Sequence, residues 1–132
     1  MGVCLHRQIQ DLLDRKYEEP KKDFVYKDIF LVGKLDYVFP NNPDEILEFK
    51  TSLETIEEAK PWQVHQLKMY CTMFNKPFGT VYQPMMDSNG IYLRDIGQVE
   101  RDDIWAEKEL EKLYNYHLRL EKIWNKKEQT NQ

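Results

Sequence analysis

The spacing of apolar residues changes several times along the chain, and each change marks an expected element. Apolar residues at positions 5, 9, 12 and 13 recur at helical intervals and predict an amphipathic helix over residues 3 to 17. Residues 24 to 39 alternate as strands do, PNNPD at 40 to 44 predicts a turn, and EILEFKTS at 45 to 52 predicts another strand. The alternation divides the first strand region into two faces: Leu31, Leu35, Tyr37 and Phe39 against Val32, Lys34, Asp36 and Val38.

The second half of the chain returns to helical spacing and then to strands. AKPWQVHQLKMYCTMF at 59 to 74 has a stripe of apolar residues three and four apart, which predicts a helix with one core-facing side. Residues 78 to 84 and 90 to 96 predict a strand pair around MMDSNG, and residues 102 to 127 predict a long charged helix. This order indicates an α/β protein with a mixed sheet, a single domain over 1–132, with its core at 1–96 and a C-terminal helix at 97–132.

The long C-terminal helix carries an apolar seam. Its members alternate spacings of three and four: Leu110, Leu113, His117, Leu120 and Trp124. A seam of this kind is typical of a helix that packs on a core or pairs with another helix. We expect this helix to pack over the core, with a dimer contact as the second interpretation, and His117 to be a satisfied core histidine.

Composition narrows the class of protein. A chain of 132 residues with 41% hydrophobic residues can bury one real core but not two. The formal net charge of −4 argues against a protein that coats nucleic acid regardless of sequence, although it leaves room for a metal-dependent enzyme acting on DNA. There is no apolar run of 18 residues and no signal peptide, so we expect a soluble, cytoplasmic protein with no membrane partner.

Candidate chemistry first appears in the hairpin formed by residues 33 to 52. If Phe39 pairs with Glu45 across a five-residue loop, the pairing is centred on Asn42. In that register Asp36 lies directly opposite Glu48. Two carboxylates about 5 Å apart repel each other unless a cation lies between them.

The same register places Lys50 beside the two carboxylates. Leu47 and Phe49 then point to the opposite, core-facing side together with Leu35 and Tyr37. Carboxylates, a main-chain carbonyl and water are the ligands that Mg²⁺ and Mn²⁺ commonly take, so the hairpin is a candidate site for such an ion. The alternative from these residues alone is a solvated strand face with scattered charges.

Four short motifs occur in order along the first half of the chain. They are Gly2-x-x-x-His6, Gly33-x-x-Asp36, Glu48-x-Lys50 and Gln66-x-x-x-Tyr70. In this order they resemble the PD-(D/E)xK nuclease superfamily, and within it the RecB-type exonuclease branch that includes the CRISPR-associated exonucleases. The resemblance covers residues 2 to 70 and implies a restriction-endonuclease-like core.

The resemblance also implies roles for the site residues. His6, Asp36 and Glu48 would bind Mg²⁺ or Mn²⁺ together with the carbonyl of Phe49, and Lys50 would orient or help deprotonate the attacking water. A metal that acidifies its water and neutralises charge on a phosphate suits hydrolysis of a phosphodiester. For His6, the alternative is a side chain that caps or packs at a helix start.

Further residues have supporting roles or two interpretations. Gln66 and Tyr70 lie four apart on one helix face, from which they can reach a DNA phosphate, a base or the groups around the metal. Lys34 falls opposite Lys50 in the predicted register and would contact phosphate or point to solvent. Trp62, which follows a proline, is favoured as a packing anchor at a helix start over a residue that stacks on a single strand.

The cysteines mark a departure from the CRISPR-associated branch, which usually has four that bind an iron–sulfur cluster. Cys4 and Cys71 are isolated, so we expect two buried thiols and no iron–sulfur cluster. The sequence begins close to the histidine motif and shows no helicase or accessory domain, so we expect a minimal, stand-alone nuclease of the kind that a virus or mobile element encodes. We expect an exonuclease acting on single strands or DNA ends, and the sequence allows a homo-oligomer without requiring one.

Two other functions stay open. The first is a structure-specific endonuclease of the same superfamily, such as a junction resolvase. The second is a non-catalytic DNA-binding or assembly protein that keeps the fold. The combination of His6, Asp36, Glu48 and Lys50 favours an enzyme, because DNA binding alone does not require metal ligands in this arrangement.

Overall fold

A computed structural model of the chain describes residues 21–130. The helix expected at 3 to 17 lies outside these residues. The described elements are, in order, β1 (Lys21–Tyr26), β2 (Ile29–Lys34), β3 (Tyr37–Phe39), β4 (Asn42–Phe49), α2 (Pro61–Met73), β5 (Phe78–Asp87), β6 (Gly90–Glu100) and α3 (Asp103–Thr130). The expected α/β class, the strand pair after α2 and the long final helix are confirmed, with both strands of the pair longer than predicted.

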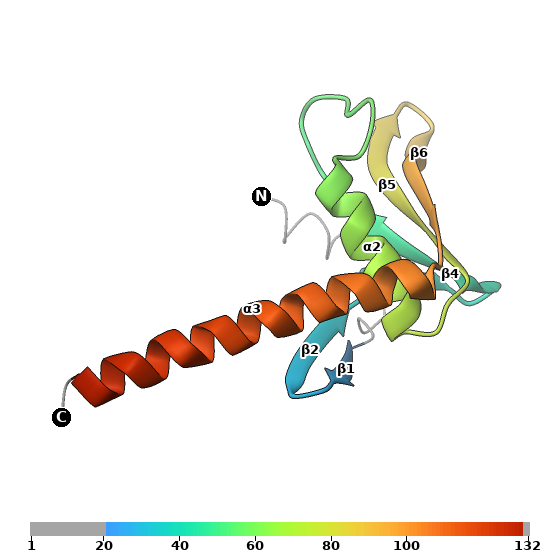
Figure 1. Ribbon diagram of the computed structural model, residues 1–132. Coiled ribbons are helices and arrows are strands. Elements are labelled where there is room, and N and C mark those ends of the chain that lie inside the picture. The colour runs from blue at the N-terminus through green and yellow to red at the C-terminus, as the bar shows by residue number, and fades with distance from the viewer. Residues whose placement is uncertain (1–20, 131–132) are drawn as a thin grey trace.

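The strands form a two-stranded sheet and a four-stranded mixed sheet. β1 pairs with β2, and the larger sheet has the order β3-β4-β5-β6. β4 and β5 run parallel, whereas the other neighbours are antiparallel. Parallel strands need a crossover connection, and α2 provides it while lying against one face of this sheet (Figure 1).

The main core lies between α2 and the mixed sheet. Leu67 and Cys71, which are four residues apart on α2, meet Ile46 of β4 and Val81 of β5. The whole cluster comprises Leu35, Ile46, Ala59, Leu67, Cys71, Val81, Ile96 and Val99. Burial raises the pKa of the Cys71 thiol to about 11, so this cysteine is a buried thiol as predicted.

A second, aromatic cluster lies on the other face of the mixed sheet. Tyr37, Leu47 and Phe49 are buried there, and the Tyr37 ring stacks on the Phe49 ring with centroids 6.4 Å apart. Leu35 was expected on this face but belongs to the main core. The chain leaves β2 at residue 34 and begins β3 at residue 37, so the alternation expected across 24 to 39 is broken at this point.

The 24 to 39 region forms parts of three strands. β1 and β2 are joined by the two-residue turn Lys27-Asp28, in which Lys27 has a φ of 51°. Tyr37 pairs with Leu47, as the predicted register requires, but Phe39 pairs with Asn42. A register shift between Tyr37 and Phe39 therefore replaces the predicted five-residue loop by a tight turn.

Gly33 allows β2 to pass close to the end of α2. A Cβ atom at this position would lie 2.8 Å from a ring carbon of Phe74 and 2.9 Å from the terminal methyl carbon of Met73. Neither distance is tolerated without movement of those side chains. The glycine of the Gly33-x-x-Asp36 motif thus has a packing reason.

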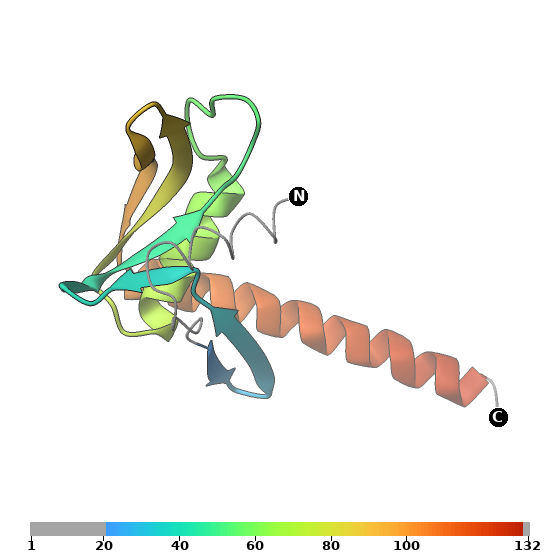
Figure 2. The ribbon, with the colours of Figure 1, turned by 180° about the vertical axis from the view of Figure 1, so that it is seen from behind.

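The first turns of α3 pack on the rest of the molecule, and the remainder extends away from it in both views (Figures 1 and 2). The Asp102 carboxylate accepts a hydrogen bond from the Trp105 N–H (3.0 Å) and caps the helix. Ala106 and Leu110 are buried, whereas apolar side chains further along are exposed: Leu113, Tyr116, Leu120, Ile123 and Trp124. The expected packing over the core is therefore correct only for the first part of the helix.

His117 is not the core histidine that was predicted. It lies on α3 beyond the packed turns, and its Nε2 is 3.2 Å from Glu121 one turn further on. The β1–β2 hairpin contacts α3 nearer its start, where the Tyr26 hydroxyl and the Lys27 ammonium both donate to Glu111, at 2.6 and 2.9 Å. Within the described part of the chain, neither helix combines the length and apolarity needed to cross a bilayer.

Candidate functional site

Asp36, Glu48 and Lys50 come together at the end of β4. The main-chain N–H of Phe49 donates to Asp36 Oδ2 at 2.8 Å, so Asp36 is held beside the strand. The Lys50 ammonium donates to Glu48 Oε1 at 3.1 Å. The three side chains that the hairpin register grouped from the sequence are therefore neighbours in the structure.

The pleat of β4 explains which way the Glu48 side chain points. Ile46 belongs to the main core and Leu47 to the aromatic cluster, so Glu48 shares its sheet face with Ile46, on the side of α2. Its parallel partner on β5 is Val81, another core residue. The face that carries the charged residues is thus also the face of the main core, and Glu48 is only 8% exposed.

Lys50 continues the alignment of β4 with β5 beyond the end of the strand. Its N–H donates to the carbonyl of Tyr82 at 2.9 Å, next to the last paired residues, Phe49 and Tyr82. This main-chain hydrogen bond fixes the residue that carries the ammonium group. The Lys50 side chain is mostly covered, which strengthens its attraction to the Glu48 carboxylate.

The Glu48 carboxyl group has a strongly altered acidity. Burial, followed by the charge of Asp36, raises the pKa of Glu48 to about 7 from its ordinary 4.5, and Lys50 opposes this shift. Without a metal, the folded protein therefore keeps the Glu48 proton to a higher pH than an exposed glutamate does. A cation placed between Asp36 and Glu48 would remove their repulsion and favour the ionised form.

Gln83 is a buried polar residue that the sequence reading did not identify. Its amide oxygen accepts a hydrogen bond from the Ile56 N–H, and its amide nitrogen donates to the Glu54 carbonyl, each at 2.8 Å. The guanidinium of Arg94 donates to the Ile56 carbonyl as well. These bonds fix the loop that leads from Lys50 to α2, and the available signal was one glutamine inside the apolar strand segment GTVYQP.

One face of α2 presents polar and aromatic side chains at intervals of four residues. Gln66 and Tyr70 share this face as predicted, and the Gln66 amide donates to the Tyr70 hydroxyl at 3.3 Å. Trp62 lies one turn earlier and is 59% exposed, so the favoured interpretation of Trp62 as a packing anchor is wrong. The Lys50 ammonium lies 5.4 Å from the centre of the Trp62 ring.

The remaining predicted site residues are Lys34 and His6. Lys34 is exposed on β2 and pairs with Lys21 of β1, so its predicted position opposite Lys50 is wrong. The chain changes sheets between β2 and β3, which the predicted continuous register did not include. His6 lies outside the described residues.

The donor atoms at the end of β4 suit a hard divalent cation. Asp36 and Glu48 supply carboxylate oxygens, and the main-chain carbonyl of Phe49 directly follows Glu48 in the chain. Over residues 21–130, no group of three His, Cys, Asp or Glu side chains is placed to hold a metal ion. A metal at this position would therefore need water or a ligand from outside the described residues in addition to the two carboxylates.

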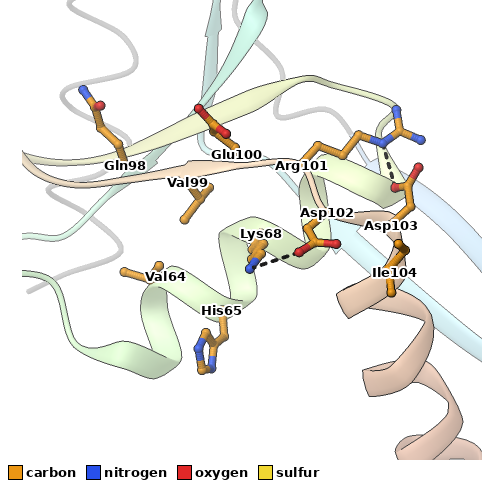
Figure 3. Close-up of a pocket in the computed structure, with 10 residues that line it drawn as sticks. All are labelled: Val64, His65, Lys68, Gln98, Val99, Glu100, Arg101, Asp102, Asp103 and Ile104. Atoms are coloured by element: carbon orange, nitrogen blue, oxygen red, sulfur yellow. Dashed lines mark hydrogen bonds and ion pairs between the residues drawn. The ribbon is translucent and has the colours of Figure 1, made fainter.

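A separate pocket of about 630 Å³ lies between α2 and the junction of β6 with α3 (Figure 3). Four of its charged side chains form two pairs: Lys68 is 3.9 Å from Asp102, and the Arg101 guanidinium donates to Asp103 at 2.8 Å. None of the three residues grouped at the end of β4 lines it. We interpret this pocket as part of the packing junction between α2 and α3 and not as the catalytic site.

Comparisons with known proteins inform the fold alone. No protein-family model matches the chain, and no curated protein matches it. A solved structure described as "Crystal structure of SSO0001" is similar, with a TM-score of 0.56 and 17% sequence identity. The match covers 83% of this chain and 56% of the other, so the chain spans a little over half the length of that structure.

Proposed function

We propose that the protein is a divalent-metal-dependent DNA nuclease of the PD-(D/E)xK superfamily, with a restriction-endonuclease-like core and closest in kind to the RecB-type exonucleases. It hydrolyses phosphodiester bonds in single strands or at DNA ends inside the cell. The observation that carries this proposal is the meeting of Asp36, Glu48 and Lys50 at the end of β4. Two carboxylates and an ammonium in contact are the groups that such hydrolysis uses.

The fold and the order of the motifs support the proposal. The crossover through α2 places the Gln66-x-x-x-Tyr70 face on the helix that packs against the strand carrying Glu48. Gly33 is needed for close packing three residues before Asp36. Within residues 21–130, Gly33 and the Gln66-x-x-x-Tyr70 helix thus each have a packing reason at their positions in the fold.

Each of the proposed site residues has its own role in the hydrolysis of the phosphodiester. Asp36 and Glu48, with the carbonyl of Phe49 and with His6, would hold Mg²⁺ or Mn²⁺, whose bound form supplies an acidified water and positive charge against the phosphate. Lys50 holds Glu48 in place and brings a second positive charge to the phosphate that is cut. Gln66 and Tyr70 offer an amide and a phenol to the backbone of the DNA.

Cleavage of DNA by the purified protein tests this proposal. We expect linear single-stranded DNA to be degraded with Mg²⁺ or Mn²⁺, not with EDTA, and Asp36→Asn to lower the rate by at least about 100-fold. The amide oxygen of this variant can still accept the Phe49 N–H, so the fold is retained and only the charge is lost. Lys50→Ala should also slow cleavage, whereas Glu57→Gln, on an exposed loop residue, should not.

The outcome separates the three functions. A protein that degrades linear strands but leaves circular single strands intact is an exonuclease, whereas cutting of a circle identifies an endonuclease. Absence of cleavage with either metal, or equal cleavage by Asp36→Asn, rejects the enzyme and leaves a DNA-binding or assembly protein.

A further inference from the structure

Trp62 exposes a large aromatic ring directly beside the proposed site of cleavage. Its side chain is 59% exposed at the first turn of α2. The ring centre lies 5.4 Å from the Lys50 ammonium, which in turn contacts Glu48 at 3.1 Å. The exposed ring therefore lies one side chain away from the two carboxylates.

Hydrogen bonds at residues 59 to 63 fix the backbone from which the Trp62 side chain projects. Ala59 donates its N–H to the Ile96 carbonyl at 2.8 Å, which ties the chain before α2 to β6. The Gln63 amide oxygen accepts the Lys60 N–H at 2.9 Å, and Pro61 occupies the first helical position, where its fixed φ suits the helix. A ligand that stacks on Trp62 would therefore not have to order this part of the backbone on binding.

Exposure alone does not distinguish Trp62 from the other tryptophans. Trp124 is as exposed, at 63%, but lies on the extended part of α3, where its indole donates to Glu128. Trp105 is partly covered and its ring packs against His65, with centroids 5.4 Å apart. A lysine, Lys68, also lies over the Trp105 ring at 4.7 Å, but Lys68 is paired with Asp102. Trp62 is the exposed tryptophan whose ring lies against Lys50, the lysine that contacts Glu48.

We propose that Trp62 is a nucleobase-binding residue on which an unpaired base of single-stranded DNA stacks, so that the neighbouring phosphate lies at Lys50. This inference rests on the proposed nuclease function and specifies its substrate. Every base offers a flat π surface, and stacking on tryptophan is tolerant of sequence. In a duplex both faces of each internal base are covered by its neighbours, so only single strands or frayed ends can use the ring.

Gln66 and Tyr70 continue the face of α2 that begins with Trp62. These residues follow Trp62 at intervals of four, so the three side chains share one helix face. A strand whose base stacks on Trp62 would meet an amide and a phenol along its backbone further along the helix. The face thus combines one stacking surface with hydrogen-bonding groups, as single-strand binding requires.

Binding can be measured without cleavage by following the fluorescence of Trp62 alone. In the Trp105→Phe, Trp124→Phe variant, Trp62 is the sole tryptophan of the chain. In EDTA and low salt, we expect oligothymidylate to quench its emission on binding. An oligomer of the same length with abasic sugars carries the same phosphates and should not quench it.

The matched substitutions are Trp62→Ala and Trp124→Ala in the otherwise unchanged chain. We expect Trp62→Ala to raise the Kd for oligothymidylate about 5- to 100-fold and to leave the Kd for the abasic oligomer within about twofold. Trp62→Phe should recover much of the affinity, because phenylalanine retains a stacking surface. Trp124→Ala should bind both oligomers as the unchanged protein does.

The results distinguish failure of this inference from failure of the proposed function. Unchanged oligothymidylate binding by Trp62→Ala, or an equal loss for the abasic oligomer, overturns the stacking role even if the protein cuts DNA. Base-dependent quenching in a protein that cuts no DNA keeps the stacking role and removes the nuclease. Oligouridylate compared with oligodeoxyuridylate tests the sugar alone, because the bases are identical: weaker binding of the ribose oligomer supports DNA, whereas tighter binding overturns DNA as the ligand.

Discussion

Glu48 is the residue at which folding and the proposed chemistry oppose each other. A carboxyl group that is only 8% exposed and close to Asp36 loses hydration and meets a like charge. Lys50 offsets part of this cost through its contact at 3.1 Å. Without a cation, ionisation of Glu48 therefore weakens the folded state, which a sequence selected only for stability would avoid.

A pH titration of stability tests this conflict. Because the pKa of folded Glu48, about 7, lies above its ordinary 4.5, the protonated group stabilises the fold below about pH 4.5. That contribution is lost as pH rises to about 7. We expect Glu48→Gln to be more stable than the unchanged protein above pH 7 by up to about 3 kcal/mol, with the difference shrinking towards pH 5.

Urea unfolding in EDTA at several pH values between 5 and 8 measures this difference. Glu57→Gln, which changes a carboxylate on the exposed loop, is the control and should follow the unchanged protein at every pH. A constant difference between Glu48→Gln and the unchanged protein across this range would show that Glu48 titrates normally.

The sequence predicted part of the site residue by residue. Asp36, Glu48 and Lys50 follow from local pairing, because Tyr37 pairs with Leu47 in the register that the hairpin implied. The burial of Gln83 has a local signal in the apolar segment around it, but its hydrogen-bond partners do not follow from any local pattern, since they lie 27 and 29 residues away. Exposure of Trp62 likewise depends on where α2 lies over the sheet, which its neighbours in sequence do not reveal.

At the scale of elements, the two parts of α3 contribute unequally to the free energy of unfolding. Leu110 is 3% exposed where the helix meets the rest of the molecule, and Leu120 is 46% exposed on the extended part. Both occupy the same apolar seam in the sequence. Helical spacing predicted the seam, but only the neighbouring elements decide how much of it is buried.

This division predicts unequal effects of the same substitution. We expect Leu110→Ala to lower the free energy of unfolding by about 2–5 kcal/mol, because it leaves a cavity in a packed contact. Leu120→Ala serves as the matched control and should change it by no more than about 0.5 kcal/mol. Urea unfolding followed by far-ultraviolet circular dichroism provides both values, and equal losses would show that the far part of α3 is also packed in solution.

The whole molecule brings distant segments to one place. Asp36 follows the β1–β2 hairpin, Glu48 lies on β4, and α2 arrives over them after a loop held by Gln83. Binding of an ion to this assembly and not to the unfolded chain must stabilise the fold. The stabilisation can be measured without any substrate.

We therefore expect Mg²⁺ or Mn²⁺ to raise the Tm of the unchanged protein. At a concentration 100 times the Kd, the gain in folding free energy is about 2.7 kcal/mol. Asp36→Asn should lose most of this gain, Glu57→Gln should keep it, and EDTA should reverse it. An equal rise in Tm for Asp36→Asn would place the ion elsewhere.

The sequence by itself determined the class of fold, the existence of α2, β5, β6 and α3, and the pairing that groups Asp36 with Glu48. These features depend on periodicity and on contacts between residues close in the chain. The tertiary structure decided the break between β2 and β3, the burial of Glu48, the loop anchor at Gln83 and the exposure of Trp62. Each of these depends on segments far apart in sequence, whose packing local patterns do not specify.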